Sequence, residues 1–365
     1  MTQIKQWANP GGLVALLLAA VVFPLVITDP TTTTITVFVL LFAAAATSWN
    51  IFSGYTGYIA LGHAAYFGIG AYSLALICER WHIPAGGEPF YFVPLCGLIA
   101  GVFAIPFGAI ALRTRRHTFV VITIATFFIM QLLAYNLHDL THGSAGLDMP
   151  IPTQWYGSQF GLPPSAFYNL PFYYAALIVT LAALAVSWFV RHSKYGLGLL
   201  AIRDDEDRAL GLGVKTGAFK LSAFVVSAIF VGMAGAIYAY FIGSVQPQFD
   251  FDALYDVAIA LMVFMGGIGT LTGPILGAIV VEWAQQNLAN IQITIGNTTL
   301  SGGGFYLILY GALFLVVILL LPQGVVPSAR SLWNRWAVQR TDSAPPSASP
   351  ATPLPQTTTQ EEVRA

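Results

Sequence analysis

The chain has 365 residues, of which 56% are hydrophobic and 8% are charged, and its mean hydropathy is +0.72. Soluble domains carry roughly 25% charged residues, so the composition excludes an ordinary soluble protein and predicts a membrane protein with many spans. The formal net charge is −1 and no basic run is present, which argues against nucleic-acid binding.

Apolar runs alternate with polar connections along the whole chain, and each run predicts a span. The first, 13–28, is expected to be an uncleaved span because no small-residue cleavage site follows it. Residues 31–34 are expected to form a turn before the second span, 35–52. Further spans are expected at 91–112, 118–137, 172–190, 219–242, 254–267, 273–290 and 305–321. With a glycine-rich helix after residue 52, these predict an all-α, polytopic membrane protein of about ten transmembrane helices.

The glycine-rich stretch 49–72 holds five glycines within seventeen positions. Each glycine would weaken a helix by about 1 kcal/mol relative to alanine. Two interpretations stay open: close helix packing, or a broken helix that lines the substrate path. A structural role is favoured for the histidine in it. The candidate residues are Asn50, Gly54, Gly57, Gly62, His63, Gly68 and Gly70.

Residues 191–220 hold ten of the 31 Lys, Arg, Asp and Glu residues, so this segment must lie in water. Its apolar positions from 197 to 212 fit one face of a single helix, with Asp204 and Arg208 as a favourable pair four residues apart. Gly211 and Gly213 are expected to end this helix. The segment therefore predicts a short helix beside the membrane that is offered to a partner.

The basic residues fix the expected orientation, because cytoplasmic loops are enriched in Lys and Arg. With ten spans and a cytoplasmic N-terminus, only Arg80 of the fifteen basic residues falls outside, and both termini are cytoplasmic. The cytoplasmic set is Lys5, Arg113, Arg115, Arg116, Arg191, Lys194, Arg203, Arg208, Lys215, Lys220, Arg330, Arg335, Arg340 and Arg364.

A second glycine-rich turn and one acidic residue mark the later spans. Gly266, Gly267, Gly269 and Gly273 are expected to form a tight turn between two spans. Glu282 is the strongest ionisable candidate inside a span, either lining the path in a proton-linked role or bonding structurally. Asp256 lies near a span end and is expected to be exposed.

No catalytic constellation is present, so an enzyme is not expected. No lysine follows a glycine, which excludes a Walker A motif, and neither a Ser/His/Asp nor an HExxH pattern occurs. His138 and His142 lack a third metal ligand and are expected in an ordinary loop. Cys78 and Cys96 are expected to be small buried side chains. No metal or cofactor is expected in this chain.

Five blocks of residues resemble LivM-type permeases, the membrane subunits of branched-chain amino acid ABC importers. The resemblance covers about residues 40–325, and a long Pro/Ser/Thr-rich tail and His63 after Gly62 depart from it. The blocks are Trp49-Asn50 to Gly68-Ile69-Gly70-Ala71-Tyr72, Gly143-Ser144-Ala145-Gly146-Leu147, Tyr195-Gly196 to Phe224, Met262 to Ala278, and Tyr310-Gly311 to Pro322-Gln323-Gly324.

The resemblance implies a bacterial inner-membrane permease subunit that works with a second, LivH-like permease, ATP-binding cassette subunits that bind ATP-Mg, and a periplasmic binding protein. It places a cytoplasmic coupling helix in the region 191–220, and the residues that it implies for coupling to the ATPase are Arg203, Asp204, Asp205, Glu206 and Gly211.

Three alternatives stay open: a urea or short-chain amide ABC permease, a stand-alone carrier or channel, and a membrane scaffold. The scarcity of ionisable groups in the spans favours an external driving force over a secondary carrier. The predicted domains are a transmembrane permease domain, 1–330, and a disordered cytoplasmic tail, 341–365.

Overall fold

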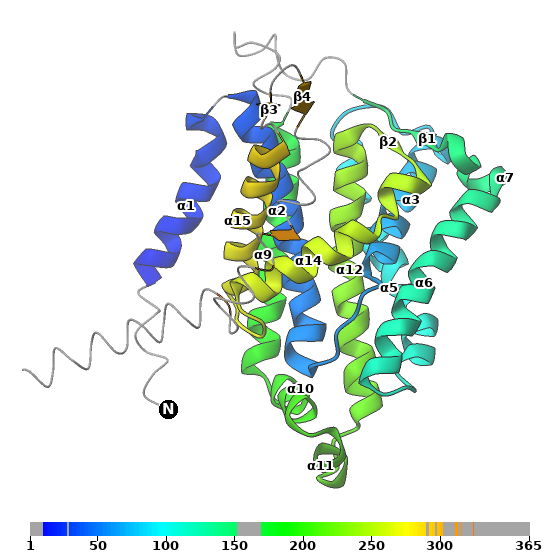
Figure 1. The fold of residues 1–365 in the computed structure, drawn as a ribbon, viewed down its shortest axis with the longest axis vertical. Helices are drawn as coiled ribbons and strands as arrows, with labels where there is room; N and C mark the ends of the chain where they lie inside the picture. Colours follow the sequence, from blue (N-terminus) through cyan, green and yellow to red (C-terminus); the bar gives the residue numbers. More distant parts are fainter. Residues whose placement is uncertain are drawn as a thin grey trace, which may run out of the picture. The chain divides into compact units, whose positions relative to one another are not determined.

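A computed structural model of the chain describes residues 10–27, 29–151, 169–289, 292–295 and 298–301 and the single positions 311, 312, 315 and 324 (Figure 1). All of these lie in one compact unit, Met1–Pro327. The expected tail, 341–365, and nearly all of the expected last span, 305–321, lie outside the described residues.

Helices make up nearly all of the described structure. Two small antiparallel pairs of strands occur, with Leu147 opposite Val245 and Gln292 opposite Ser301. The elements are α1 (Pro10–Val26), α2 (Pro30–Trp49), a π-helix (Asn50–Gly54), α3 (His63–Arg80), α4 (Glu88–Tyr91), α5 (Val93–Ala111), α6 (Arg116–Asn136), α7 (His138–Thr141), a 3-10 turn (Gly143–Ala145), β1 (Leu147–Asp148), α9 (Leu170–His192), α10 (Lys194–Asp204), α11 (Glu206–Gly211), α12 (Thr216–Ile242), β2 (Ser244–Val245), α13 (Pro247–Asp250), α14 (Ala253–Gly266), α15 (Gly273–Ala289), β3 (Gln292–Ile295) and β4 (Thr298–Ser301).

Within the described residues, 5 helical segments are long and apolar enough to cross a membrane. They confirm the prediction of a polytopic helical membrane protein. These segments are Pro30–Gly54, Val93–Ala111, His117–Asn136, Leu170–His192 and Thr216–Ile242.

The turn expected at residues 31–34 is wrong, because α2 already begins at Pro30. Asp29 caps this helix: its Oδ2 accepts hydrogen bonds from the Thr32 amide at 2.8 Å and the Thr32 hydroxyl at 2.6 Å. These bonds lower the pKa of the Asp29 carboxyl, so it stays ionised beside the positive end of the helix dipole. A capping aspartate followed by proline starts a helix where four threonines suggested a turn.

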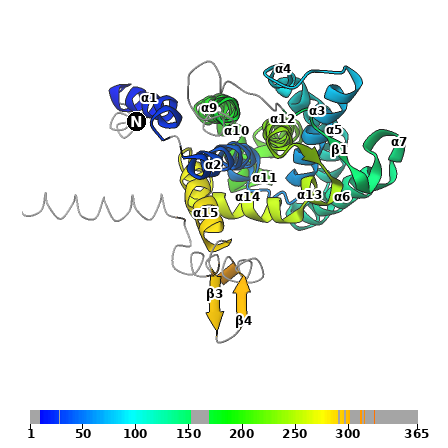
Figure 2. The same cartoon turned by 90° about the horizontal axis from the view of Figure 1, so that it is seen from above.

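Helix α14 lies across the bundle rather than along it. In Figure 2, α2, α9 and α12 are seen end-on, whereas α14 is seen along its length. Its 14 residues extend about 21 Å at 1.5 Å per residue, less than the roughly 30 Å of a bilayer core. The helix expected at 254–267 therefore exists, but it leads obliquely from α13 to the turn at 267–272.

Helix α12 is the central helix, and it packs closely on α3 through small residues. A Cβ on Gly70 would lie 2.0 Å from the Gly232 carbonyl oxygen, and one on Gly235 would lie 2.1 Å from the Phe67 carbonyl oxygen. Backbone atoms sit at these points, so neither contact can relax by rotation of a side chain. Small residues let the two helices approach to backbone contact, as is common in membranes.

Two alanine substitutions on α12 test this packing. Gly235→Ala should lower the stability of the purified protein by roughly 1–3 kcal/mol, because the new methyl group overpacks the contact with α3. Gly217→Ala is the matched control, since a Cβ there meets nothing within 4 Å, and it should leave the melting temperature unchanged or slightly raised. Equal melting temperatures for both variants in a thermal unfolding assay would contradict the close approach.

Candidate functional site

The chain breaks helical structure between α2 and α3. Helix α2 continues as the π-helix Asn50–Gly54, Gly57 then takes a positive φ of 73°, and α3 starts only at His63. Polar groups bond the backbone of this break: the Trp49 indole donates to the Ala60 carbonyl at 2.8 Å, and the Ala60 amide donates to Ser53 Oγ at 3.3 Å. Both hydrogen bonds lie in the protein interior, where a peptide group without a hydrogen-bond partner is costly.

Asp256 of α14 caps the first turn of α3, so the expectation that it is exposed is wrong. It is 3% exposed, and its Oδ1 accepts from the His63 amide at 2.8 Å and the Ala64 amide at 3.1 Å. The carboxylate thus satisfies two amides that a helix start leaves without an intrahelical acceptor. It also ties the transverse helix to the break.

Asn50 joins the break to the second glycine-rich segment. Its Oδ1 accepts from the Gly269 amide at 2.8 Å, and its Nδ2 donates to the Thr270 carbonyl at 2.8 Å. Gly269 has a φ of 74°, which permits the backbone to face Asn50 in this way. The two glycine-rich segments, separated by about 200 positions in the sequence, therefore meet through one amide side chain.

The single helix expected from 197 to 212 is wrong, because the chain breaks at Asp205. Asp205 is extended (φ −158°, ψ 109°) and caps α11, accepting from the Arg208 amide at 3.0 Å. Its Oδ2 also pairs with Arg208 Nε at 2.9 Å, in place of the expected pair with Asp204. The expected common apolar face is lost as well, since Ala209 is buried whereas Leu212 is 84% exposed.

Two arginines tie α9 and α10 to the broken segments. Arg203 Nη1 donates to the Gly54 carbonyl at 2.8 Å, and Arg191 Nη1 donates to the Gly269 carbonyl. Arg203 also lies against two glycines. A Cβ added to Gly57 would be 3.1 Å from Arg203 Cγ, and a Cβ added to Gly269 would be 2.4 Å from Arg203 Nη1. Side chains at these glycines would displace the arginine.

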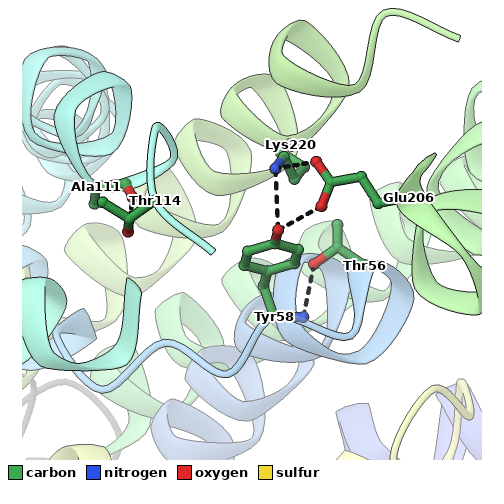
Figure 3. Close-up of polar contacts among 6 residues, drawn as sticks. All are labelled: Thr56, Tyr58, Ala111, Thr114, Glu206 and Lys220. Carbon is green, nitrogen blue, oxygen red and sulfur yellow. Dashed lines mark hydrogen bonds and ion pairs between the residues drawn. The ribbon is translucent and has the colours of Figure 1, made fainter. Parts of the chain in front are cut away.

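A partly buried ion pair ties α11 to α12 (Figure 3). Lys220 Nζ lies 2.5 Å from Glu206 Oε1 and 3.3 Å from the Tyr58 hydroxyl, which itself donates to Glu206 Oε2. Lys220 Nζ is also 4.4 Å from the centre of the Tyr58 ring. Lys220 is 3% exposed, so these groups compensate the burial of its charge.

Tyr195 adds a further bond between α10 and α12. Its hydroxyl hydrogen-bonds Ser222 Oγ at 2.6 Å and donates to the Phe219 carbonyl at 3.0 Å. Burial raises the pKa of the Tyr195 phenol, so the phenol keeps the proton that these bonds require. We use the name α10–α11 junction for the set Asn50, Gly54, Tyr58, Arg191, Tyr195, Arg203, Glu206, Lys220, Gly269 and Thr270.

The opposite face of α10 and α11 is exposed. Leu210 is 59% exposed, and both charged and apolar exposed residues lie near it in the sequence. Of the expected coupling residues, Arg203 and Glu206 point into the protein and Asp205 caps α11, whereas Asp204 and Gly211 are exposed. The exposed set is Asp204, Asp207, Arg208, Leu210, Gly211 and Leu212.

The other candidate residues lie away from this junction. His63 is fully buried, with Nε2 2.7 Å from Ser227 Oγ. Glu282 is 2% exposed; its Oε1 accepts from Gln286 Nε2 at 3.1 Å, and no described group bonds its Oε2.

The remaining candidate glycines lie in close contacts. A Cβ on Gly62 would be 2.4 Å from the Thr123 carbonyl oxygen, and one on Gly68 would be 2.5 Å from the Phe251 ring. Gly267 has a φ of 116° at the end of α14. Gly266 and Gly273 approach each other, with 1.8 Å between a Cβ on the first and the carbonyl oxygen of the second.

The cysteines follow the expectation, whereas the ordinary loop expected at His138 is wrong, because His138 begins the short helix α7. Cys78 and Cys96 are free and buried, as predicted. His142 Nε2 lies 3.5 Å from Glu79 Oε1 at the end of α7. Among the described residues, no group of three or more His, Cys, Asp or Glu side chains is placed to hold a metal ion.

Sequence reasoning missed Tyr58, Lys220 and the cap provided by Asp256. One signal for Lys220 was available. It shares a helical stripe, at intervals of three, four and seven, with Ala223, Phe224 and Ser227, and all of these are buried. A lysine on the buried stripe of a helix requires a partner, which the count of charges alone did not reveal.

Replacement of Asn50 tests the link between the two broken segments. Asn50→Leu should lower stability by roughly 1–3 kcal/mol, because the Gly269 amide and the Thr270 carbonyl both lose their partner. Asn136→Leu is the control, since that side chain makes one exposed bond to the Leu132 carbonyl, and it should change stability by less than about 0.5 kcal/mol. Thermal unfolding in detergent measures both, and an Asn50→Leu variant as stable as the control would refute the link.

The chain is similar to known permeases over most of its length. It is 26% identical over 337 residues to the high-affinity branched-chain amino acid transport system permease protein LivM of Escherichia coli K12, covering 87% of this chain and 75% of that relative. It is 25% identical over 297 residues to the LivH permease protein of the same kind of system from Salmonella typhimurium, covering 78% and 91%.

A shorter match joins the chain to an autoinducer 2 import system permease protein, LsrC of Photorhabdus luminescens, with 27% identity over 32% of this chain and 36% of that relative. No solved structure matches the chain. The family described as "Branched-chain amino acid transport system / permease component" matches residues 31–321, which include every residue of the α10–α11 junction. The chain therefore belongs to this family of permease components: it is a multi-pass membrane protein and a transport subunit of the bacterial ABC transporter type.

Proposed function

We propose that this chain is the permease subunit of an ATP-driven importer, forming the path for branched-chain or other neutral amino acids across the bacterial inner membrane. The α10–α11 junction is the observation that carries the proposal. Its inner side bonds both broken segments, through Gly54 and Gly269, and its outer side is exposed. A partner that moves α10 and α11 would therefore move backbone inside the bundle.

The proposed orientation places both termini and the junction in the cytoplasm. Figure 1 draws the connection between α5 and α6, which carries Arg113 and Arg115, at the same lower end as α10 and α11. The C-terminal end of α3, which carries Arg80, lies at the opposite end. This distribution agrees with the excess of Lys and Arg in cytoplasmic loops.

The proposed partners follow from the exposed face and from the relatives. The mixture of Leu210, Leu212 and nearby charges suits a protein groove, and we assign it to ATP-binding cassette subunits that hold ATP-Mg. The similarity to both LivM and LivH supports a second, LivH-like permease beside this chain. A periplasmic binding protein would deliver the substrate, so the path itself need not bind it tightly.

Amino acids are favoured as substrate by the extent of similarity. The match to LivM covers 87% of this chain, whereas the match to the autoinducer 2 permease covers 32%. In the proposed cycle, ATP binding closes the ATPase subunits, which displace α10 and α11. The broken segments then shift the path between outward-open and inward-open states.

Purification in mild detergent from the native host, followed by reconstitution, tests this function. An ATPase and a second permease should copurify. Liposomes that contain the complex and its binding protein should take up leucine only when ATP is present on the side of the membrane that the ATPase faces. Uptake by this chain alone would refute the proposal in favour of a carrier. Uptake of urea or acetamide without uptake of leucine would refute the assigned substrate class.

A further inference from the structure

The Tyr58–Glu206–Lys220 cluster brings together three separate parts of the chain. Tyr58 lies in the break after the π-helix, Glu206 is the first residue of α11, and Lys220 lies in the first turns of α12. Each side chain contacts the other two, as Figure 3 shows. Displacement of α11 relative to α12 must therefore alter the contacts of Tyr58.

Apolar side chains could fill the volume that the Tyr58–Glu206–Lys220 cluster occupies, so packing alone does not account for its charges. A buried ion pair gains little net stability over apolar side chains of similar volume, yet loss of one partner leaves an uncompensated charge. Here the lysine is 3% exposed, and the glutamate side chain is 27% exposed. Such a pair specifies one relative position of its helices, because the bonds depend on direction as well as distance.

Helix α11 is set off from its neighbours by a change of backbone conformation at each end. The helix has six residues, with extended Asp205 before it and Gly213, at a φ of 87°, after it. Two residues before Asp205, Arg203 bonds the Gly54 carbonyl, and immediately after Asp205, Glu206 bonds the Tyr58 hydroxyl. The two contacts bracket residues 54–58, which lead from the end of the π-helix into the irregular backbone before α3.

We propose that Tyr58, Glu206 and Lys220 are positioning residues that transmit displacement of α11 to the break between α2 and α3. This inference rests on the proposed function, because it assigns the contact through which ATP hydrolysis is coupled to opening of the path. The cluster touches neither nucleotide nor substrate in this scheme. It sets how far residues 54–58 move when α11 is displaced.

The test measures leucine uptake and ATP hydrolysis in the same liposomes, with the complete complex of permease, ATPase and binding protein. Lys220→Met should lower the number of leucine molecules moved per ATP about ten-fold, while ATP hydrolysis changes less than about two-fold. The exchanged pair, Glu206→Lys with Lys220→Glu, should recover much of the ratio. Lys194→Met, which removes an exposed lysine of α10, should keep the native ratio.

Tyr58→Phe keeps the experiment informative if Lys220→Met fails to assemble. It removes only the hydroxyl that bonds Glu206 and Lys220, and it should lower the ratio about three-fold with normal recovery of the complex. Native ratios in every variant that assembles, or an exchanged pair that assembles without recovering the ratio, would overturn the inference. A native complex without ATP-dependent leucine uptake would instead overturn the proposed function.

Discussion

Backbone that leaves a helix inside a packed bundle has no water to bond, and the arrangement of this bundle depends on that constraint. The break between α2 and α3 leaves peptide groups exposed to the interior of the protein. Trp49 and Ser53 bond Ala60, Thr123 accepts from the Leu61 amide at 3.2 Å, and Asp256 caps α3. Polar side chains are scarce in these spans, and the ones named here form hydrogen bonds with the chain's own backbone.

The same constraint links the breaks to α10 and to the end of α9. Arg203 satisfies the Gly54 carbonyl, Arg191 satisfies the Gly269 carbonyl, and Asn50 joins the two segments. These bonds are needed for the fold, and they are also the contacts that a moving α10–α11 pair would pull. The bonds that stabilise the breaks are therefore also the bonds that would transmit movement: a shift of α10 acts on the first break through Arg203, and Asn50 links that break to residues 269–270.

Local pattern was enough to predict much of the fold. Apolar runs located the long spans, glycine density located the break, and charge density located the segment 191–220. The failures involve partners distant in sequence: Asp256 bonds an amide 193 positions earlier, and Lys220 bonds a hydroxyl 162 positions earlier. Spacing along one helix cannot show whether another segment will cover a charge, so both residues were expected in water.

Burial divides the charges of residues 191–220 into two groups with different consequences. Glu206 and Lys220 compensate each other inside the junction, whereas Asp204 and Asp207 face outward. Removing an inner charge strands its partner in a poorly hydrated site, and removing an outer charge changes only the exposed face. Loss of transport after substitution of Glu206 would therefore not by itself identify a contact with an ATPase. Only the outward-facing acids report on a docking partner without disturbing the bundle that the partner moves.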